Sequence, residues 1–190
     1  MSVSHDDLLA LLQARHSCRE FAPRPLETGM LEALEAAFSQ APQAGGARHL
    51  ACTFITDADT IRELADAGRR AFAGLCNEIP SAFAREETRR YGENFFWFAD
   101  APALAVVTCR KPPAFLRVAM GDKAALLWGG ELSGAMAAFA LLLAAQTLGL
   151  GACCLTGPLI VWREMETRLA IPKHDNLVLL AALGHRKDKT

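Results

Sequence analysis

A short basic segment stands out among the residues that could do chemistry. Arg15, His16, Ser17 and Arg19 bring two guanidinium groups, an imidazole and a hydroxyl within five consecutive positions. Guanidinium groups bind phosphate through paired hydrogen bonds, and a turn adds free backbone N–H groups. The alternative is a solvated loop in which Arg15 only interacts with the dipole of a preceding helix. Taken alone, the cluster favours the loop, because a few basic residues are a weak motif.

Two glycine-containing segments could approach a flat ligand closely. Residues 41–46 read Ala-Pro-Gln-Ala-Gly-Gly, and glycine permits close backbone contact, although an ordinary loop explains this stretch equally well. Residues 149–158 read Gly-Leu-Gly-Ala-Cys-Cys-Leu-Thr-Gly-Pro, which predicts a strand followed by a turn with free main-chain amides. A fourth segment, Gly-His-Arg-Lys at 184–187, brings basic side chains to a strand end, unless it is only a solvated tail.

The six cysteines favour neither a disulfide framework nor a metal site. They are scattered, no Cys-x-x-Cys occurs, and the five histidines are dispersed, so we expect no metal. The adjacent Cys153 and Cys154 suggest a redox pair. Neighbouring strand residues point to opposite faces, however, and free cysteine is a common buried residue, so we expect a structural role.

Composition narrows the class of protein. The chain has 190 residues and no seam, which predicts a single domain over 1–190. Its net charge of −1 does not favour nucleic acid or an anionic membrane as a partner. Fifteen of the twenty basic residues are arginine, which suits phosphate contacts, and the hydrophobic share of 52% is compatible with a large subunit interface. The first residues lack a basic and an apolar signal region, so we expect a cytoplasmic protein.

Hydrophobic periodicity predicts an α+β or mixed α/β layout. Helical spacing begins at an N-cap at Ser4, again at Thr28, and again at Asp59 or Thr60. We expect helices over 4–14, 28–38, 59–70, 122–148 and 162–170, strands over 50–56, 103–109, 152–156 and 177–183, and an irregular excursion over 71–98.

A membrane-spanning helix is an alternative interpretation of the apolar stretch 132–155, because a helix of roughly 20 residues spans a bilayer. Glu131 is the only charge between Lys123 and Arg163. The stretch is rich in alanine and glycine and lacks basic or aromatic anchors at both ends. We therefore expect a buried core helix that Gly149 and Gly151 terminate, and no membrane association.

These segments, taken in order, resemble the nitroreductase family of flavoenzymes. Arg15–Arg19 resembles the family's Arg-Arg-Ser-x-Arg motif except at His16, and Pro42–Gly46 takes the place of its Pro-Ser-Ala-Gly-Asn loop. A long Ala/Leu helix running into Gly-Leu-Gly, here 141–151, and the ending Ala-Leu-Gly-His at 182–185 are also typical. The order and spacing agree over nearly the whole chain.

The resemblance implies a three-layer α/β/α fold, with a mixed, mainly antiparallel sheet and a long buried central helix. It also implies a homodimer with two FMN sites at the interface, each built from both subunits. Arg15 and Arg186 would lie near the phosphate, His16 and Ser17 would add polar contacts, and Arg19 would approach the ribityl chain and the pyrimidine edge. The remaining contacts implied are Pro42, Gln43, Ala44 and Gly46 from the partner subunit, Cys154, Leu155, Thr156 and Gly157 along the isoalloxazine with a backbone amide near N5, and Asn94 at the pyrimidine edge.

The activity implied is hydride transfer from NADH or NADPH through flavin N5 to a nitroaromatic, quinone, enone or flavin acceptor. The sequence leaves the acceptor and the choice of NADH or NADPH open. Two departures motivate an alternative, a non-catalytic flavin-binding or scaffold protein. Gly46 stands where an asparagine is common, and the tail ends before a basic residue that many members use for the phosphate. Arg186, Lys187 or Lys189 would have to substitute for it.

Overall fold

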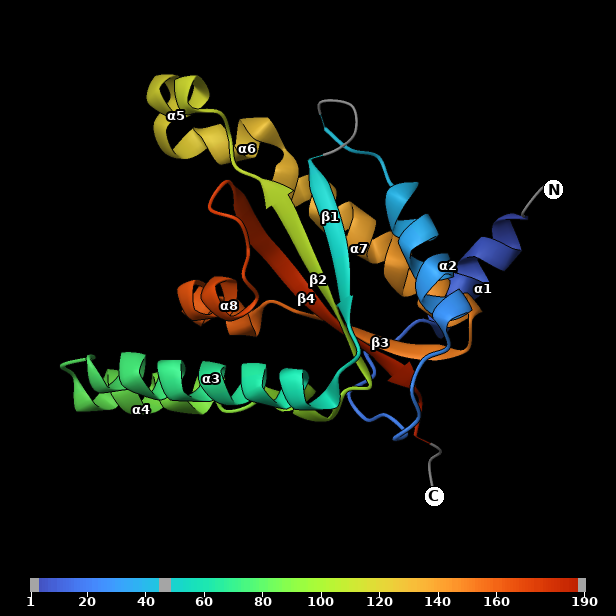
Figure 1. Ribbon diagram of the computed structural model, residues 1–190, viewed down its shortest axis with the longest axis horizontal. Helices are drawn as coiled ribbons and strands as arrows, with labels where there is room; N and C mark the ends of the chain where they lie inside the picture. The colour runs from blue at the N-terminus through green and yellow to red at the C-terminus, as the bar shows by residue number, and fades with distance from the viewer. Residues whose placement is uncertain (1–3, 45–48, 188–190) are drawn as a thin grey trace.

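The computed structural model of the protein describes residues 4–44 and 49–187. Gly46 and Lys189 therefore lie outside the described residues. The described part contains one four-stranded sheet between two layers of helices (Figure 1).

The sheet has the strand order β1-β2-β4-β3, and every neighbouring pair is antiparallel. Its strands are β1 (Leu50–Ile55), β2 (Ala103–Arg110), β3 (Leu150–Leu155) and β4 (Asp175–His185). The central strands β2 and β4 are almost continuously apolar and buried, as expected for strands covered on both faces. A single parallel bridge joins Ser17 to Ala152 of the edge strand β3. All four predicted strands are confirmed, with ends that differ by up to two residues.

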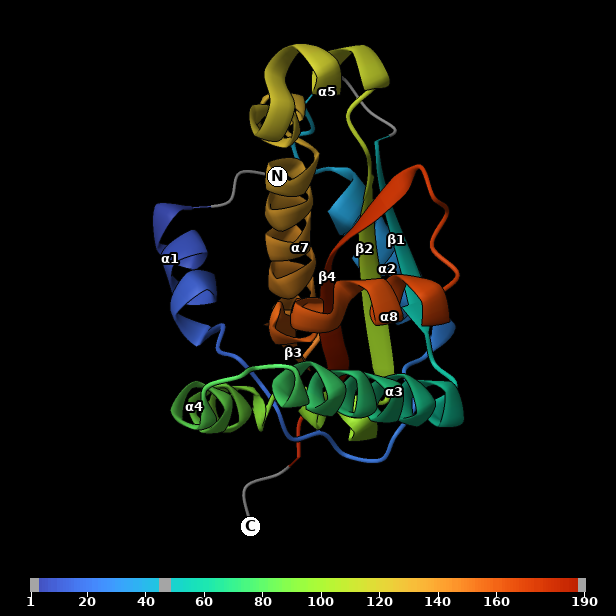
Figure 2. The same cartoon turned by 90° about the vertical axis from the view of Figure 1, so that its left-hand side faces the viewer.

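Helices cover both faces of the sheet, which confirms the three-layer architecture (Figures 1 and 2). Helices α2 (Thr28–Ser39) and α7 (Gly130–Thr147) pack on one face over a core of leucine and alanine. Helices α3 (Ala58–Asn77) and α8 (Trp162–Arg168), with the 3₁₀ turn η1 (Trp97–Asp100), pack on the other face over an aromatic core.

The first helix confirms the predicted capping box, whereas the second begins differently. In α1 (His5–Ala14) the Ser4 hydroxyl accepts the Asp7 N–H at 3.1 Å, and the Asp7 carboxylate accepts the Ser4 N–H at 3.3 Å. The prediction that Thr28 caps α2 is wrong. Glu27 occupies the N-cap without a side-chain hydrogen bond, and Thr28 is already helical.

The prediction of a single long helix over 122–148 is wrong for the first third of that range. The chain forms α5 (Ala114–Met120), a 3₁₀ turn η2 (Gly121–Lys123) and α6 (Ala124–Trp128) before α7. Gly129 interrupts the helix with φ +69°, a conformation that glycine adopts without steric cost. A Cβ at this position would lie 2.7 Å from the Cβ of Ala44. Gly149, with φ +72°, follows the end of α7 as predicted, but Gly151 lies inside β3 and terminates nothing.

The excursion over 71–98 is more regular than the sequence suggested. Helix α3 continues to Asn77 instead of ending near Arg70, and α4 (Ala82–Gly92) follows after a short turn. The two helices lie side by side and form an arm that projects from the sheet, while α5 and α6 form a second projection at the other end (Figures 1 and 2). The sequence of α4 is polar and arginine-rich and buries only Gly92, so it offers few apolar residues from which a helix could be predicted.

Helix α7 is the central helix of the leucine–alanine layer. By length and composition alone, the stretch Ala114–Thr147 would pass as a membrane span. It is interrupted at Gly129, and α7 buries one side against the sheet through small and apolar residues. The interpretation as a core helix therefore agrees with its packing.

Candidate functional site

The outer edge of β3 is the element around which the predicted site residues gather. The Cys18 N–H donates to the Ala152 carbonyl at 3.0 Å, so the segment after α1 crosses this edge at Ala152. Backbone groups of alternate residues point to the same side of a strand, so the Cys154 N–H also points away from β4. No described backbone group bonds it from the outer side. This edge therefore presents a free amide directly beside the predicted phosphate-binding segment.

Arg15 faces the same edge. Its side chain lies near Cys154, where burial and the neighbouring Cys153 raise the pKa of the Cys154 thiol to about 11 and the positive charge of Arg15 opposes that shift. Arg15 itself is half-buried, whereas His16, Ser17 and Arg19 are exposed. Of the four polar residues in this segment, Arg15 is the one whose charge acts on Cys154, near the end of β3.

Arg186 lies at the beginning of β3. Its Nη2 donates to the Gln146 side-chain oxygen near the end of α7 and to the Leu150 carbonyl at 3.3 Å, while its Nε is buried without a hydrogen-bond partner among the described residues. A guanidinium at the C-terminal end of a helix is favoured by the helix dipole. Arg186 therefore has a structural function in this conformation and keeps one unused donor.

The far end of β3 brings in the aromatic segment. A Cβ on Gly157 would lie 2.5 Å from the ring of Phe95, so the chain passes closely over that ring. The exposed Asn94 directly precedes Phe95 and is thereby placed beside the segment that contains Thr156. Thr156 is exposed and Leu155 is buried. Asn94 therefore lies near the turn after β3, and its contact with a flavin stays a prediction.

The loop residues Pro42, Gln43 and Ala44 are not brought to β3 of the same chain. The Ala44 N–H donates to the Ser133 hydroxyl at 2.9 Å, which fixes the loop to the first turns of α7. The side-chain oxygen of Gln43 is buried and has no partner among the described residues. The loop lies at the opposite end of the sheet from the segment after α1 (Figure 1).

Four of the six cysteines are buried, and Cys52 and Cys154 are partly exposed. All six are free, and within the described residues no cluster of three or more ligating side chains could hold a metal. Cys153 is buried and Cys154 is partly exposed on the opposite face of β3. The raised pKa of Cys154 disfavours the thiolate that redox exchange requires.

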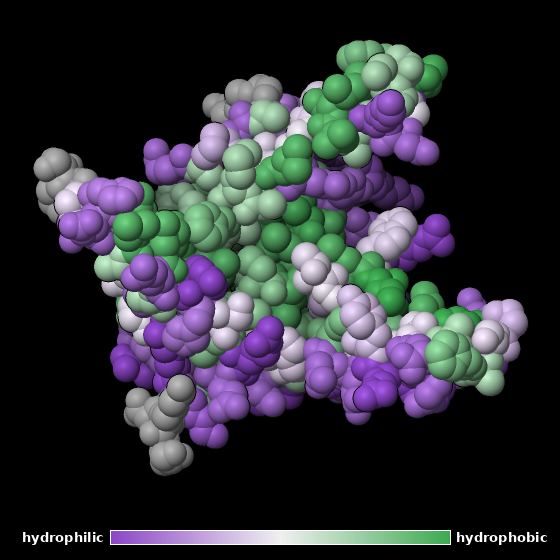
Figure 3. Space-filling model, turned by 180° about the vertical axis from the view of Figure 1, so that it is seen from behind, coloured by the Kyte–Doolittle hydropathy of each residue, from purple (hydrophilic) through white to green (hydrophobic). Residues whose placement is uncertain are grey.

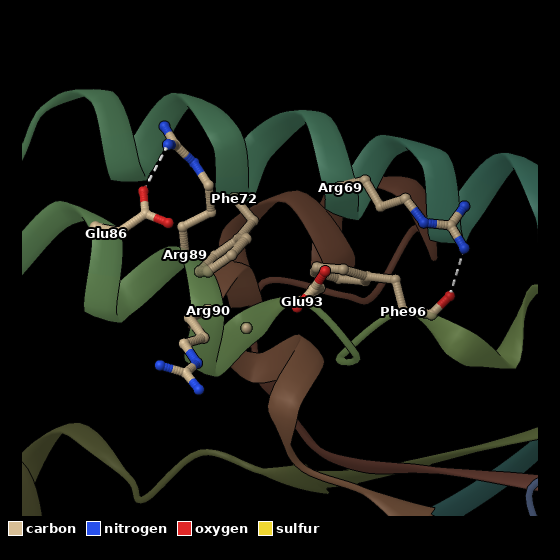
Figure 4. A pocket seen from close by; sticks show the side chains of 8 residues that line it. Arg69, Phe72, Glu86, Arg89, Arg90, Glu93 and Phe96 are labelled. Atoms are coloured by element: carbon tan, nitrogen blue, oxygen red, sulfur yellow. Dashed lines mark hydrogen bonds and ion pairs between the residues drawn. The ribbon is translucent and has the colours of Figure 1, made fainter.

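A cavity of about 480 Å³ lies between α3 and α4 (Figure 4). Phe72 and Phe96 form its apolar wall, and arginine and glutamate side chains surround its rim. Arg89 pairs with Glu86 at 3.2 Å, and Arg69 donates to the Phe96 carbonyl at 2.7 Å (Figure 4). The first pair lies within α4, whereas the second joins α3 to the segment before η1, and both lie apart from the residues predicted to bind a ligand.

Three contributors to the site escaped the sequence argument. The Ala152 carbonyl anchors Cys18, the Phe95 ring supports Gly157, and Ser133 fixes the loop at Ala44. Each joins segments far apart in the chain. The one available signal was Ser133, a polar residue inside an apolar helix, which is the only buried polar side chain among the described residues.

Comparisons with known proteins agree with this architecture. A sequence model of the nitroreductase family matches residues 12–185. A search of curated protein sequences finds no match.

Several solved structures share the fold. A BluB-like flavoprotein from Clostridium difficile 630 superimposes with a TM-score of 0.81 at 22% identity, covering 96% of this chain and 91% of that one. A nitroreductase with bound FMN from Bacteroides fragilis gives 0.71 at 22%, covering 97% and 94%. An NADPH:FMN oxidoreductase from Vibrio harveyi complexed with NAD⁺ gives 0.69 at 17%, covering 95% and 69%.

Proposed function

The chain belongs to the nitroreductase family, and we propose that it is an FMN-dependent oxidoreductase that passes a hydride from NADH or NADPH through flavin N5 to a second substrate. The acceptors that we consider are a nitroaromatic, a quinone, an enone or free flavin. Two similar structures support the cofactor and the donor, because one contains FMN and the other is an NADPH:FMN oxidoreductase complexed with NAD⁺.

The outer edge of β3 is the observation that carries the proposal. It gathers a positive charge at Arg15, polar groups at His16 and Ser17, and an outward N–H at Cys154 beside one strand edge. A ligand that carries a phosphate and a flat polar ring fits this set of groups. Thr156 and Gly157 would line the ring, and Asn94 would meet its pyrimidine edge.

The phosphate end of the site is assigned first to Arg15. Arg186 already donates to two acceptors, so it would add charge nearby through its remaining donor. Arg19 is exposed and has no described partner, so it is free to reach the ribityl chain or the pyrimidine edge. Basic groups at that edge would stabilise the negative charge of a reduced flavin.

Bound FMN would supply two-electron chemistry at N5, and the protein would supply orientation and exclusion of water. The outward amide of Cys154, or that of Thr156 beyond it, would donate to the ring at that position. The cysteine thiols take no part, because burial keeps the Cys154 thiol protonated. The reaction takes a hydride from NAD(P)H and a proton from solvent, and the acceptor gains both.

We further propose that the protein acts as a homodimer. The outer side of α7 carries Leu132, Met136 and Phe139, which are 45–55% exposed and form one stripe at helical spacing. Beside this stripe, an apolar groove of about 650 Å³ runs between α7 and α2 and reaches Pro42. Exposed apolar surface of this extent is typical of an interface. A partner there would bring its residues 42–44 toward a flavin that one chain alone leaves uncovered.

Reconstitution with FMN tests the proposal. The purified protein should turn yellow, quench flavin fluorescence and show a flavin band that NADH or NADPH bleaches without oxygen. Arg15→Ala should weaken FMN binding about tenfold or more, because a charge-assisted contact to phosphate is lost. Riboflavin has no phosphate, so wild type and Arg15→Ala should bind it equally. Arg24→Ala is the matched control, because Arg24 pairs with Glu27 on the surface.

The same measurements separate the alternative of a scaffold protein. Binding of FMN without bleaching by either nicotinamide would support a non-catalytic flavin protein. A colourless protein that cannot be reconstituted would contradict the FMN proposal itself.

A further inference from the structure

Tyr91 is the only tyrosine of the chain, and it lies at the end of the arm helix α4, one residue before Gly92. Its side chain is 76% exposed, although a tyrosine ring gains free energy when its apolar surface is buried. The proposed flavin site does not use this ring. A large aromatic surface is therefore left uncovered at the base of the arm.

Two contacts fix Tyr91 in place. Its neighbour Gly92 is buried, and a Cβ there would lie 2.1 Å from the ring of Phe72, so the end of α4 lies directly against α3. The Tyr91 ring meets the Phe95 ring edge-on, with 5.1 Å between the centroids and 85° between the planes. Aromatic pairs with this geometry attract each other. One edge of Tyr91 is thus held by Phe95, while the rest of the ring faces solvent.

Phe95 connects Tyr91 to the turn after β3. The Phe95 ring packs against Phe72, with 6.0 Å between the centroids, and a Cβ on Gly157 would lie 2.5 Å from the same ring. Gly157 is one of the residues proposed to line the flavin ring. Only the width of the Phe95 ring therefore separates Tyr91 from the turn that would hold the flavin.

The arm helix α4 lies on the side of the sheet where the proposed flavin site lies. Helices α1 and α4 are both on the side of the edge strand β3 in Figure 2. Seen from behind, the arm of α3 and α4 borders a hollow with a largely apolar floor (Figure 3). Arg90 and Glu93 flank Tyr91 in the sequence with opposite charges, which offset each other. The surroundings of Tyr91 therefore suit a flat ligand without a required charge.

Phe83 in the first turn of α4 provides a contrast within the same helix. Its side chain is 78% exposed, but no aromatic pair among the described residues includes it. It precedes Tyr91 by eight residues, or about 12 Å along the helix, toward the free end of the arm. Exposure alone does not distinguish Tyr91 from Phe83, whereas contact with Phe95 does.

We propose that Tyr91 binds the second substrate, by packing against an aromatic acceptor that lies over the flavin ring. This role rests on the proposed function, because Thr156 and Gly157 are there assigned to the flavin ring. An aromatic acceptor in that place would contact the flavin on one face and Tyr91 at its outer edge or face. Of the acceptors considered, a nitroaromatic fits best, whereas a small enone has no aromatic surface to offer.

Kinetics with two acceptors test this role. The FMN-loaded protein receives NADH as donor and either nitrobenzene or ferricyanide as acceptor, without oxygen. With nitrobenzene, NADH gives a hydride and solvent gives a proton, and the nitro group loses one oxygen as water to become nitroso. With ferricyanide, which has no aromatic surface, two ions take one electron each and one proton is released. Tyr91→Ala should raise the KM for nitrobenzene about fivefold, because an aromatic contact is lost, and leave the KM for ferricyanide unchanged.

Two further variants serve as controls. Tyr91→Phe keeps the ring and should bind nitrobenzene as wild type does. Phe83→Ala removes an equally exposed ring from the same helix and should change neither KM. An equal rise for both acceptors in Tyr91→Ala, or a rise for nitrobenzene in Tyr91→Phe or Phe83→Ala that matches it, would overturn the assignment of Tyr91 to the acceptor.

Direct binding separates the role of Tyr91 from the proposed function. Because Tyr91 is the only tyrosine, fluorotyrosine labelling gives a single fluorine NMR signal from the FMN-loaded protein. Without NADH, nitrobenzene should shift this signal through its ring current, whereas nitrocyclohexane, with the same nitro group on a non-aromatic ring, should not. An unshifted signal in a protein whose bound flavin is bleached by NADH would contradict the role of Tyr91 alone. A sample without flavin absorbance after reconstitution would contradict the proposed function and, with it, this role.

Discussion

Helices α3 and α7 lie on opposite faces of the same sheet, yet their outer sides differ completely. Helix α3 buries Ile61 and Leu64 and presents ion pairs outward, such as Arg62 with Asp59 at 2.9 Å. Helix α7 buries small residues and presents Leu132, Met136 and Phe139 outward. The first helix is amphipathic, whereas the second is apolar on both sides.

The difference indicates which helix faces solvent and which one would face a second chain. The outer side of α3 needs no partner to cover it, because its ion pairs are compatible with water. The outer side of α7 leaves apolar groups exposed that a second chain would cover. The outer edge of β3 and the loop 42–44 lie at opposite ends of the sheet within one subunit. A dimer with α7 in its interface would bring the loop of one subunit to the β3 edge of the other.

Charges on the outer side of α7 should have the largest effect. The double change Met136→Glu and Phe139→Glu would place two carboxylates in the proposed interface, where unpaired buried charge is very costly. The dimer dissociation constant should rise about a thousandfold or more. Sedimentation velocity over a dilution series measures it. Glu63→Lys on the exposed side of α3 is the control, and an unchanged association state in both variants would remove α7 from the interface.

Truncation on the inner sides should affect both helices alike. Leu141→Ala in α7 and Leu64→Ala in α3 each remove a buried side chain and should lower the free energy of unfolding by about 3 kcal/mol. Urea denaturation at fixed protein concentration measures the loss. A loss below about 1 kcal/mol at Leu141 would mean that the inner side of α7 is not the core side.

Gly129 separates α6 from α7 and should tolerate no side chain. Gly129→Ala would force alanine to φ +69° and bring its Cβ within 2.7 Å of Ala44. The free energy of unfolding should fall by about 1–2 kcal/mol from the backbone term alone. Gly74→Ala in α3 is the matched control, because a Cβ there meets nothing within 4 Å. Equal stability of the two variants would contradict the described break.

Loss of an ion pair on α3 should have the smallest effect. Arg62→Ala removes the pair with Asp59, and both partners are more than half exposed. Exposed pairs of this kind contribute about 0.5 kcal/mol or less, and salt should reduce even that. Thermal unfolding at low and high ionic strength measures the change. A loss as large as that of Leu141→Ala would show that the outer side of α3 packs against something.

Short-range signals in the sequence predicted much of the fold. Ser4 with Asp7 marked the first capping box, and the apolar run 103–109 marked the central strand β2, because caps and buried strands leave local patterns. The break at Gly129, where φ is +69°, was missed although the pair Gly129-Gly130 is a local signal for it, because the apolar pattern continues on both sides. The arm helix α4 was also missed, since its charged sequence contributes only Gly92 to the buried residues.

The candidate site divides in the same way. Arg15, Ser17, Cys154 and Arg186 all lie at β3, and their contacts to a flavin stay predictions. The contacts that assemble them, such as Cys18 with Ala152 and Gly157 with Phe95, are long-range and leave no local pattern. The use of Arg186 at the end of α7 follows only from three-dimensional proximity to Gln146.

Sedimentation velocity of the FMN-reconstituted protein, recorded at both protein and flavin wavelengths, tests the central claim most directly. We predict that flavin absorbance sediments with a dimer, at one FMN per chain, and is lost when the charges introduced at Met136 and Phe139 separate the subunits. Flavin that sediments with a monomer, or a dimer that carries none, would contradict the account.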